Sequence, residues 1–174
     1  MDDIGNYCEW VSFDEVWNLL IQKFNDSKDI LSILRYPYGP NIDAINRFLW
    51  SEFPNDVEAI QISGWEEYIS GNTDFENSYF TNLLFGESGL KEYDYFYIII
   101  DKCFMRKNVL KVNANQLFKF IDESPVLIDS SVFQGSDVLF ISSNKFTISF
   151  INHDGYYLSI KQFTDILKTK NHSV

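Results

Sequence analysis

The chain has 174 residues, of which 45% are hydrophobic and 17% aromatic, so it can fold around one buried core without disulfides. We therefore expect a single domain over residues 1–174 and exclude an intrinsically disordered chain. The formal net charge of −11 disfavours binding to nucleic acid or to nucleotide phosphates, because an acidic protein repels them.

The cysteines and the N-terminus indicate a compartment. Cys8 and Cys103 are the only cysteines, and we expect both to be free thiols in a reducing environment. The N-terminus begins with acidic residues and lacks the basic and apolar regions of a secretory signal. The most apolar run, residues 93–101, is far shorter than a membrane span. We therefore expect a soluble cytoplasmic protein without a membrane partner.

The first predicted element is a helix that begins after Ser12. The segment 12–15 has the form of a capping box, in which the Ser12 side chain accepts from the amide of Glu15 and the Glu15 carboxylate reaches back. Apolar residues then recur at helical spacing: Phe13, Val16, Trp17, Leu20 and Phe24. After a turn at 36–40, residues 42–49 predict a second helix that stops before Pro54.

The middle of the chain predicts strands and short helices. Alternation over 57–62 indicates a strand, residues 65–69 and 75–85 indicate helices, and β-branched and aromatic residues over 93–100 indicate a central strand buried on both faces.

The last part of the chain changes to a period of two. A basic turn at 102–107, a strand at 109–112 and a helix at 113–121 capped by Asn113 precede it. Strands at 137–142, 145–151 and 156–160 then form a meander, with a hairpin turn at Asp154 and Gly155, and residues 160–167 predict a last short helix. We therefore predict an α+β fold, with N-terminal helices packed on an antiparallel or mixed sheet that ends in a C-terminal three-strand meander.

The negative charge is concentrated in the middle of the chain. Residues 52–101 carry eleven acids against the single base Lys91, whereas residues 102–174 carry six acids and nine bases. Such a concentration attracts a cationic partner and raises its association rate, although acids can also serve only to solvate one face. Aromatic residues lie among these acids, and we expect Trp65, Tyr93 and Tyr95 to be partly exposed anchors. The predicted partner-binding residues are Asp56, Glu58, Trp65, Glu66, Glu67, Asp74, Glu76, Glu87, Glu92, Tyr93, Asp94 and Tyr95.

Motifs for catalysis and for cofactors are missing from the sequence. No Cys-x-x-Cys, His-Glu-x-x-His, calcium loop or glycine-rich phosphate loop occurs, so we predict neither a metal nor a cofactor. A nucleophilic arrangement of Cys103, His153 and an acid stays open, but a free cysteine is more often a small buried hydrophobe. Contact of nucleic acid with the bases Lys102, Arg106, Lys107 and Lys111 is a second open point, although such spacing is typical of a solvated edge. We do not expect an enzyme.

In overall character, the acidic, aromatic-rich α+β chain resembles the immunity proteins of bacterial polymorphic toxin systems, including contact-dependent growth inhibition systems. The resemblance covers the whole chain but rests on no signature motif, so it assigns no residue. It implies a cognate toxin domain, often a basic nuclease, that the immunity protein covers and neutralises, and we expect a monomer before binding. The alternative is an acidic regulatory protein or nucleic-acid mimic that occupies a basic groove on a host complex.

Overall fold

The computed structural model of the chain describes residues 7–16, 35–36, 39–40, 60–71, 77–85, 89–133, 137–144 and 148–158. Its centre is a seven-stranded sheet with the order β1-β6-β5-β7-β8-β9-β4, in which every neighbouring pair is antiparallel. The strands are β1 (Cys8–Ser12), β4 (Ile60–Gln61), β5 (Tyr95–Ile99), β6 (Asn108–Asn113), β7 (Val138–Ser142), β8 (Ile148–Ile151) and β9 (Tyr156–Leu158). A separate two-stranded sheet pairs β2 (Arg35–Tyr36) with β3 (Gly39–Pro40).

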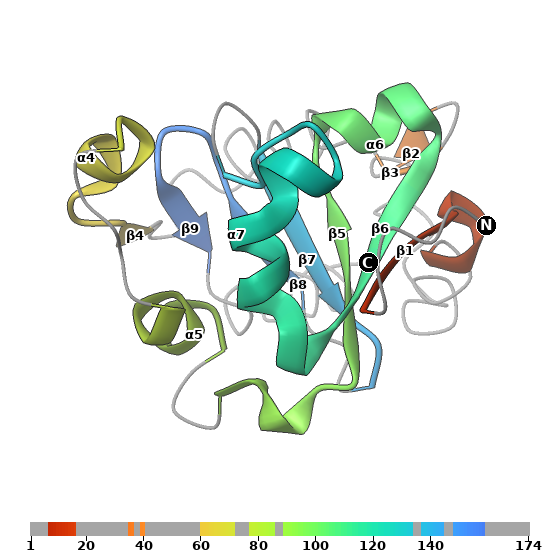
Figure 1. The fold of residues 1–174 in the computed structure, drawn as a ribbon, viewed down its shortest axis with the longest axis horizontal. Helices are drawn as coiled ribbons and strands as arrows, with labels where there is room; N and C mark the ends of the chain where they lie inside the picture. The colour runs from red at the N-terminus through yellow and green to blue at the C-terminus, as the bar shows by residue number, and fades with distance from the viewer. Residues whose placement is uncertain are drawn as a thin grey trace, which may run out of the picture.

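Helices connect several of these strands, so the α+β class is confirmed. They are α4 (Trp65–Ile69), α5 (Asn77–Phe85), the 3-10 helix η1 (Gly89–Glu92), α6 (Asp101–Arg106), the 3-10 helix η2 (Ala114–Gln116) and α7 (Leu117–Leu127). In Figure 1, α7 crosses in front of the sheet, while α4 and α5 lie towards its β9 and β4 side. None of the helices within the described ranges is long and apolar enough to cross a membrane.

The predicted central strand and meander are confirmed. β5 lies between β6 and β7, and Phe96 to Ile100 are buried without interruption, as expected for a strand covered on both faces. β7, β8 and β9 pair in sequence order and form the meander. The last turn has Gly155 in the left-handed region at φ 79°, and the amide of Gly155 donates to the carbonyl of Asn152 at 3.0 Å.

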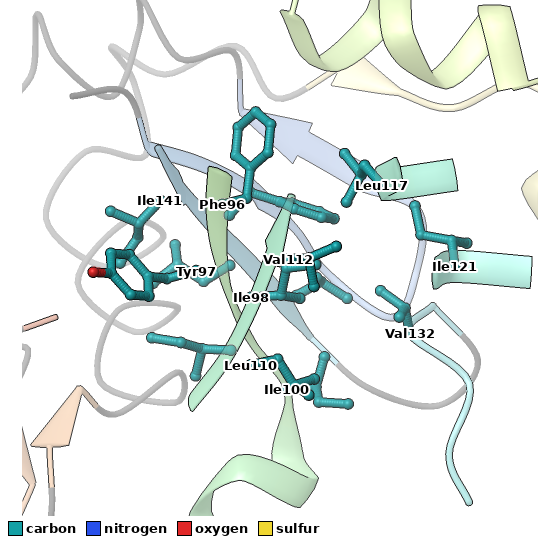
Figure 2. Close-up of a cluster of buried hydrophobic side chains, with 14 of the residues drawn as sticks. Phe96, Tyr97, Ile98, Ile100, Leu110, Val112, Leu117, Ile121, Val132 and Ile141 are labelled. Carbon is teal, nitrogen blue, oxygen red and sulfur yellow. The ribbon is translucent and has the colours of Figure 1, made fainter. Parts of the chain in front are cut away.

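One face of the sheet is covered by helices. Phe96 and Phe140 project towards α5, where the Phe85 ring lies 4.6 Å from the Phe96 ring and 6.4 Å from the Phe140 ring. Figure 2 shows Leu117 and Ile121 of α7 on the same side as Phe96 and Val112. These contacts place one part of the hydrophobic core between the sheet and its covering helices.

Three predicted details differ from the structure. Residues 101–106 form α6 instead of a basic turn, because burial of Cys103 and stacking of Phe104 on Phe13 at 5.8 Å stabilise a helical turn there. The 113–121 helix extends to Leu127, and Asn113 sits at its start without a capping side-chain bond. The capping box at Ser12 is also wrong, because Ser12 Oγ accepts from the amide of Asp14 at 3.1 Å.

The predicted N-terminal helices are described only at their start. Residues 13–16 are helical, as the spacing predicts, whereas residues 17–34, 41–59 and 159–174 lie outside the described residues. Within the described part the longest helix, α7, lies between β6 and β7, so helices are not gathered ahead of the strands.

Candidate partner-binding surface

The predicted partner-binding residues that the structure describes lie at two opposite ends of the sheet. β5 runs from Tyr95 to Ile99, and the pairs Ile99–Leu139 and Val138–Ile151 bring the β8–β9 turn to the end where β5 finishes. Indole Nε1 of Trp65 donates to the carbonyl of His153 in that turn at 2.9 Å, so α4 lies at the same end. Figure 1 shows α4 near the start of β9 and the helix that precedes β5 at the other end.

We name these two groups by their place. The α4 end comprises the predicted residues Glu66 and Glu67 together with Asp101 and Asp154, which were not predicted; all four are exposed. The β5-start end comprises Glu92, Tyr93, Asp94 and Tyr95. The described members of the predicted patch therefore do not form one continuous face. The remaining predicted residues, Asp56, Glu58, Asp74, Glu76 and Glu87, lie outside the described residues.

Trp65 is not the exposed anchor that its acidic neighbours suggested. Only 3% of the residue is exposed, and its ring packs edge-on against Phe133 with centroids 6.0 Å apart. A Cβ added at Gly155 would lie 2.2 Å from Trp65 Cγ, which shows how closely the indole covers this glycine. Trp65 therefore fixes α4 to the β8–β9 turn, while Glu66 and Glu67 on the same helix stay exposed.

His153 and Asp137 hold this turn from the side of the sheet. Asp137 Oδ1 accepts from the backbone amide of His153 at 2.9 Å and lies 2.9 Å from its Nδ1. The hydrogen bond with Asp137 raises the pKa of His153, burial opposes this, and the charges of Asp154 and Asp101 raise it further. The sequence predicted the turn but not Asp137, because a contact between residues sixteen positions apart depends on the register of β7 and β8.

The β5-start end contains a compensated charge cluster. Lys111 Nζ lies 3.0 Å from Glu15 Oε1, 3.5 Å from Glu9 Oε1 and 4.4 Å from the centroid of the Tyr95 ring. The buried Tyr97 hydroxyl donates to the same Glu15 oxygen at 2.7 Å. Burial raises the pKa of Glu15, but the hydrogen bonds from Tyr97 and Lys111 outweigh it and leave that pKa below its usual value.

The two tyrosines at this end are half-buried, as predicted, but both use their rings within the fold. The Tyr93 ring packs on Phe85 and Phe96 at 5.5 and 5.0 Å, and the Tyr95 ring meets Tyr97 edge-on at 5.4 Å under Lys111. These rings therefore contribute more to packing than to a free surface. The α4 end has four exposed carboxylates, those of Glu66, Glu67, Asp101 and Asp154, whereas the β5-start end has two, those of Glu92 and Asp94.

The cysteine arrangement left open by the sequence does not form a nucleophilic site. Cys103 is fully buried, and its thiol donates to the carbonyl of Ile98 at 3.5 Å. Burial raises the pKa of Cys103 to about 12, so the sulfur is a protonated thiol at neutral pH. His153 bonds to Asp137 instead. Across the described ranges no three His, Cys, Asp or Glu side chains are placed to bind a metal ion.

Comparisons of the chain with protein-family models, with curated protein sequences and with solved structures find no match.

Proposed function

We propose that this chain is an immunity protein, which binds a basic toxin domain and neutralises it. The observation that carries the proposal is the separation of charge along the chain, with ten more acids than bases in residues 52–101. A field of this sign attracts a cationic protein and repels nucleic acid. The resemblance in overall character to immunity proteins points in the same direction.

The α4 end is the part of the described surface best suited to this role. Glu66 and Glu67 are exposed at consecutive positions of a helix that Trp65 attaches to the β8–β9 turn. Neither carboxylate makes an ion pair in the part of the chain that the structure describes, in contrast to Glu9 and Glu15. Pre-positioned carboxylates could replace the phosphates that a basic nuclease otherwise binds.

The test begins with protection. Cells that express the toxin domain encoded beside this chain should survive when the chain is co-expressed, and the two purified proteins should form a complex. Reversing both charges in Glu66→Lys/Glu67→Lys should slow association at least tenfold at low salt, while loss of a carboxylate paired with a buried partner cation costs about 2 to 5 kcal/mol of affinity.

A matched control comes from the other end of the sheet. Glu92→Lys/Asp94→Lys changes the net charge equally and should slow association less. If cells that express the toxin domain die despite normal amounts of the wild-type chain, the proposed immunity function is wrong. Equal effects of the two double variants would remove only the assignment to the α4 end.

A further inference from the structure

The sheet has an edge at β4 that no other described strand covers. Among the described strands, β4 is the last in the sheet order and pairs only with β9, through Ile60–Tyr157 and Gln61–Tyr156. Both of its residues are exposed. A sheet edge of this kind can accept a strand from another chain.

The hydrogen bonds around β4 show which backbone groups face outward. The amide of Ile62 donates to the carbonyl of Gly155 at 2.8 Å, so Ile62 and Gly155 form a hydrogen-bonded pair. Along an antiparallel ladder, hydrogen-bonded pairs alternate with pairs that are not hydrogen-bonded. Ile60 therefore points its backbone groups towards β9, and Gln61 points its N–H and C=O away from it. Tyr156, which lies opposite Gln61, accepts from the amide of Asn152 at 2.9 Å. Its backbone groups therefore face β8, which agrees with Tyr156 and Gln61 being a pair that is not hydrogen-bonded.

The side chain beside this free backbone is apolar. Ile60 is 42% exposed, one of few large hydrophobic residues that the described surface presents, and it lies on the face that carries the buried Tyr157. A strand placed next to β4 would cover Ile60 and bond to Gln61 at the same time. The edge therefore offers both kinds of interaction that hold an added strand, which are main-chain hydrogen bonds and an apolar side-chain contact.

The charge of the sequence on either side of β4 selects the occupant. No lysine, arginine or histidine occurs between Arg47 and Lys91, while eight acids do, and Glu66 and Glu67 follow β4 within six residues. A second copy of this chain would bring the same acidic stretch to the edge and be repelled. An extended segment with lysine or arginine side chains matches the charge instead.

We infer that β4 binds an extended, lysine- or arginine-containing segment of the partner protein as an added strand. This inference rests on the proposed function, since it names how the basic partner is held. The added strand bonds to the N–H and C=O of Gln61, places an apolar side chain over Ile60 and sets its cationic side chains towards Glu66 and Glu67 of α4.

The first experiment uses the wild-type protein and a synthetic peptide of ten residues that alternates lysine and valine. Binding should shift the amide resonances of Ile60 to Ile62 and slow hydrogen exchange of the Gln61 amide at least tenfold. A peptide that alternates glutamate and valine should leave both unchanged. Shifts confined to Glu92 and Asp94, or an unchanged Gln61 amide at saturation, would overturn the inference.

The second experiment uses a backbone variant with a matched control. Gln61→Pro removes an N–H that makes no bond to β9, so it should fold, and proline at an outward-facing edge position is tolerated. It should weaken binding of the lysine–valine peptide at least tenfold, whereas Gln61→Thr, which keeps the N–H, should bind like the wild type. Thermal melts should confirm that both variants are folded.

The outcomes separate this inference from the proposed function. If wild-type cells are protected from the toxin but Gln61→Pro binds the peptide as well as Gln61→Thr, strand addition is wrong and the immunity function stands. If the peptide binds at Gln61 but cells are not protected, strand addition at β4 stands and the immunity function is wrong. A dimer of the chain joined at β4, seen by sedimentation, would also overturn the choice of a cationic occupant.

Discussion

At the scale of single residues, the β8–β9 turn and α4 depend on one another. Trp65 covers Gly155, donates to the carbonyl of His153, and so connects the end of β4 to the turn that Asp137 holds. A short helix of five residues is not stable by itself in water. The position of Glu66 and Glu67 therefore depends on this contact between an indole and a glycine.

Gly155→Ala should destabilise the protein by about 3 kcal/mol or more, because a Cβ would overlap Trp65 and the residue needs a positive φ. Gly71→Ala is the matched control, since Gly71 has φ 75° and nothing within 4 Å of an added Cβ. It should cost only the backbone strain, about 1 kcal/mol. Urea denaturation measures both, and equal losses would contradict the proposed contact.

The His153–Asp137 pair should make stability depend on pH. The pKa of His153 is raised in the folded protein, so its contribution is complete below the unfolded value of about 6.5 and is lost as pH rises through the folded pKa. Because 56% of the His153 side chain is exposed, the contribution should stay below about 1 kcal/mol.

Asp137→Asn isolates this contribution, because the amide keeps an acceptor for the backbone of His153 but removes the charge. An NMR titration of His153 should show a pKa above 6.5 in the wild type and a lower one in the variant. Unfolding free energies at pH 6 and pH 8 should differ more in the wild type than in the variant. The same pH dependence in both proteins would be evidence against the pair.

At the scale of elements, α7 continues through a proline that should interrupt it. Pro125 lies inside the helix and has no N–H to donate to the carbonyl of Ile121. Ser124 Oγ donates to that carbonyl at 2.8 Å instead and accepts from the amide of Val132 at 3.3 Å. One buried hydroxyl thus repairs the helix and attaches the loop that leads towards β7.

Ser124→Ala should therefore cost about 1 to 3 kcal/mol, because it leaves a buried carbonyl and a buried amide without partners. Ser130→Ala, whose hydroxyl makes only a long 3.5 Å contact to the carbonyl of Ser131, should change stability by less than about 0.5 kcal/mol. In a Pro125→Ala background, where residue 125 regains its N–H, the cost of Ser124→Ala should shrink. An unchanged cost there would contradict the repair.

The elements that the sequence predicted well are those whose pattern is local. The strand at 93–100 and the meander were recognisable because β-branched residues, alternation and an Asp-Gly turn determine them within a few positions. α6 was missed because its helical turn depends on Phe13 stacking on Phe104, a contact between residues 91 positions apart. Trp65 was misassigned for the same reason, since Phe133 and Gly155, which bury it, come from distant segments.

At the scale of the whole molecule, the described acids divide into those that pair with a lysine and those that have no base near them in the sequence. Glu9 and Glu15 share Lys111, and Asp129 pairs with Lys102 at 3.5 Å, whereas Glu66 and Glu67 belong to a stretch of sequence without any base. The sequence showed this excess as a property of the chain, but only the sheet register revealed that its described members occupy two ends. Self-repulsion should therefore have a measurable effect on stability.

The free energy of unfolding should rise when sodium chloride is increased from 0.01 to 0.15 M, because the Debye length falls from about 30 to about 8 Å and screens the repulsion of a −11 chain. Glu67→Gln removes an acid that has like-charged neighbours, so the gain with salt should be smaller. Glu9→Gln removes an acid that Lys111 attracts at 3.5 Å, so the gain should not shrink. Urea denaturation at the two salt concentrations compares the three proteins. A wild-type stability that is independent of salt would mean that the acidic stretch is neutralised within the fold. No excess negative charge would then remain to attract a cationic partner.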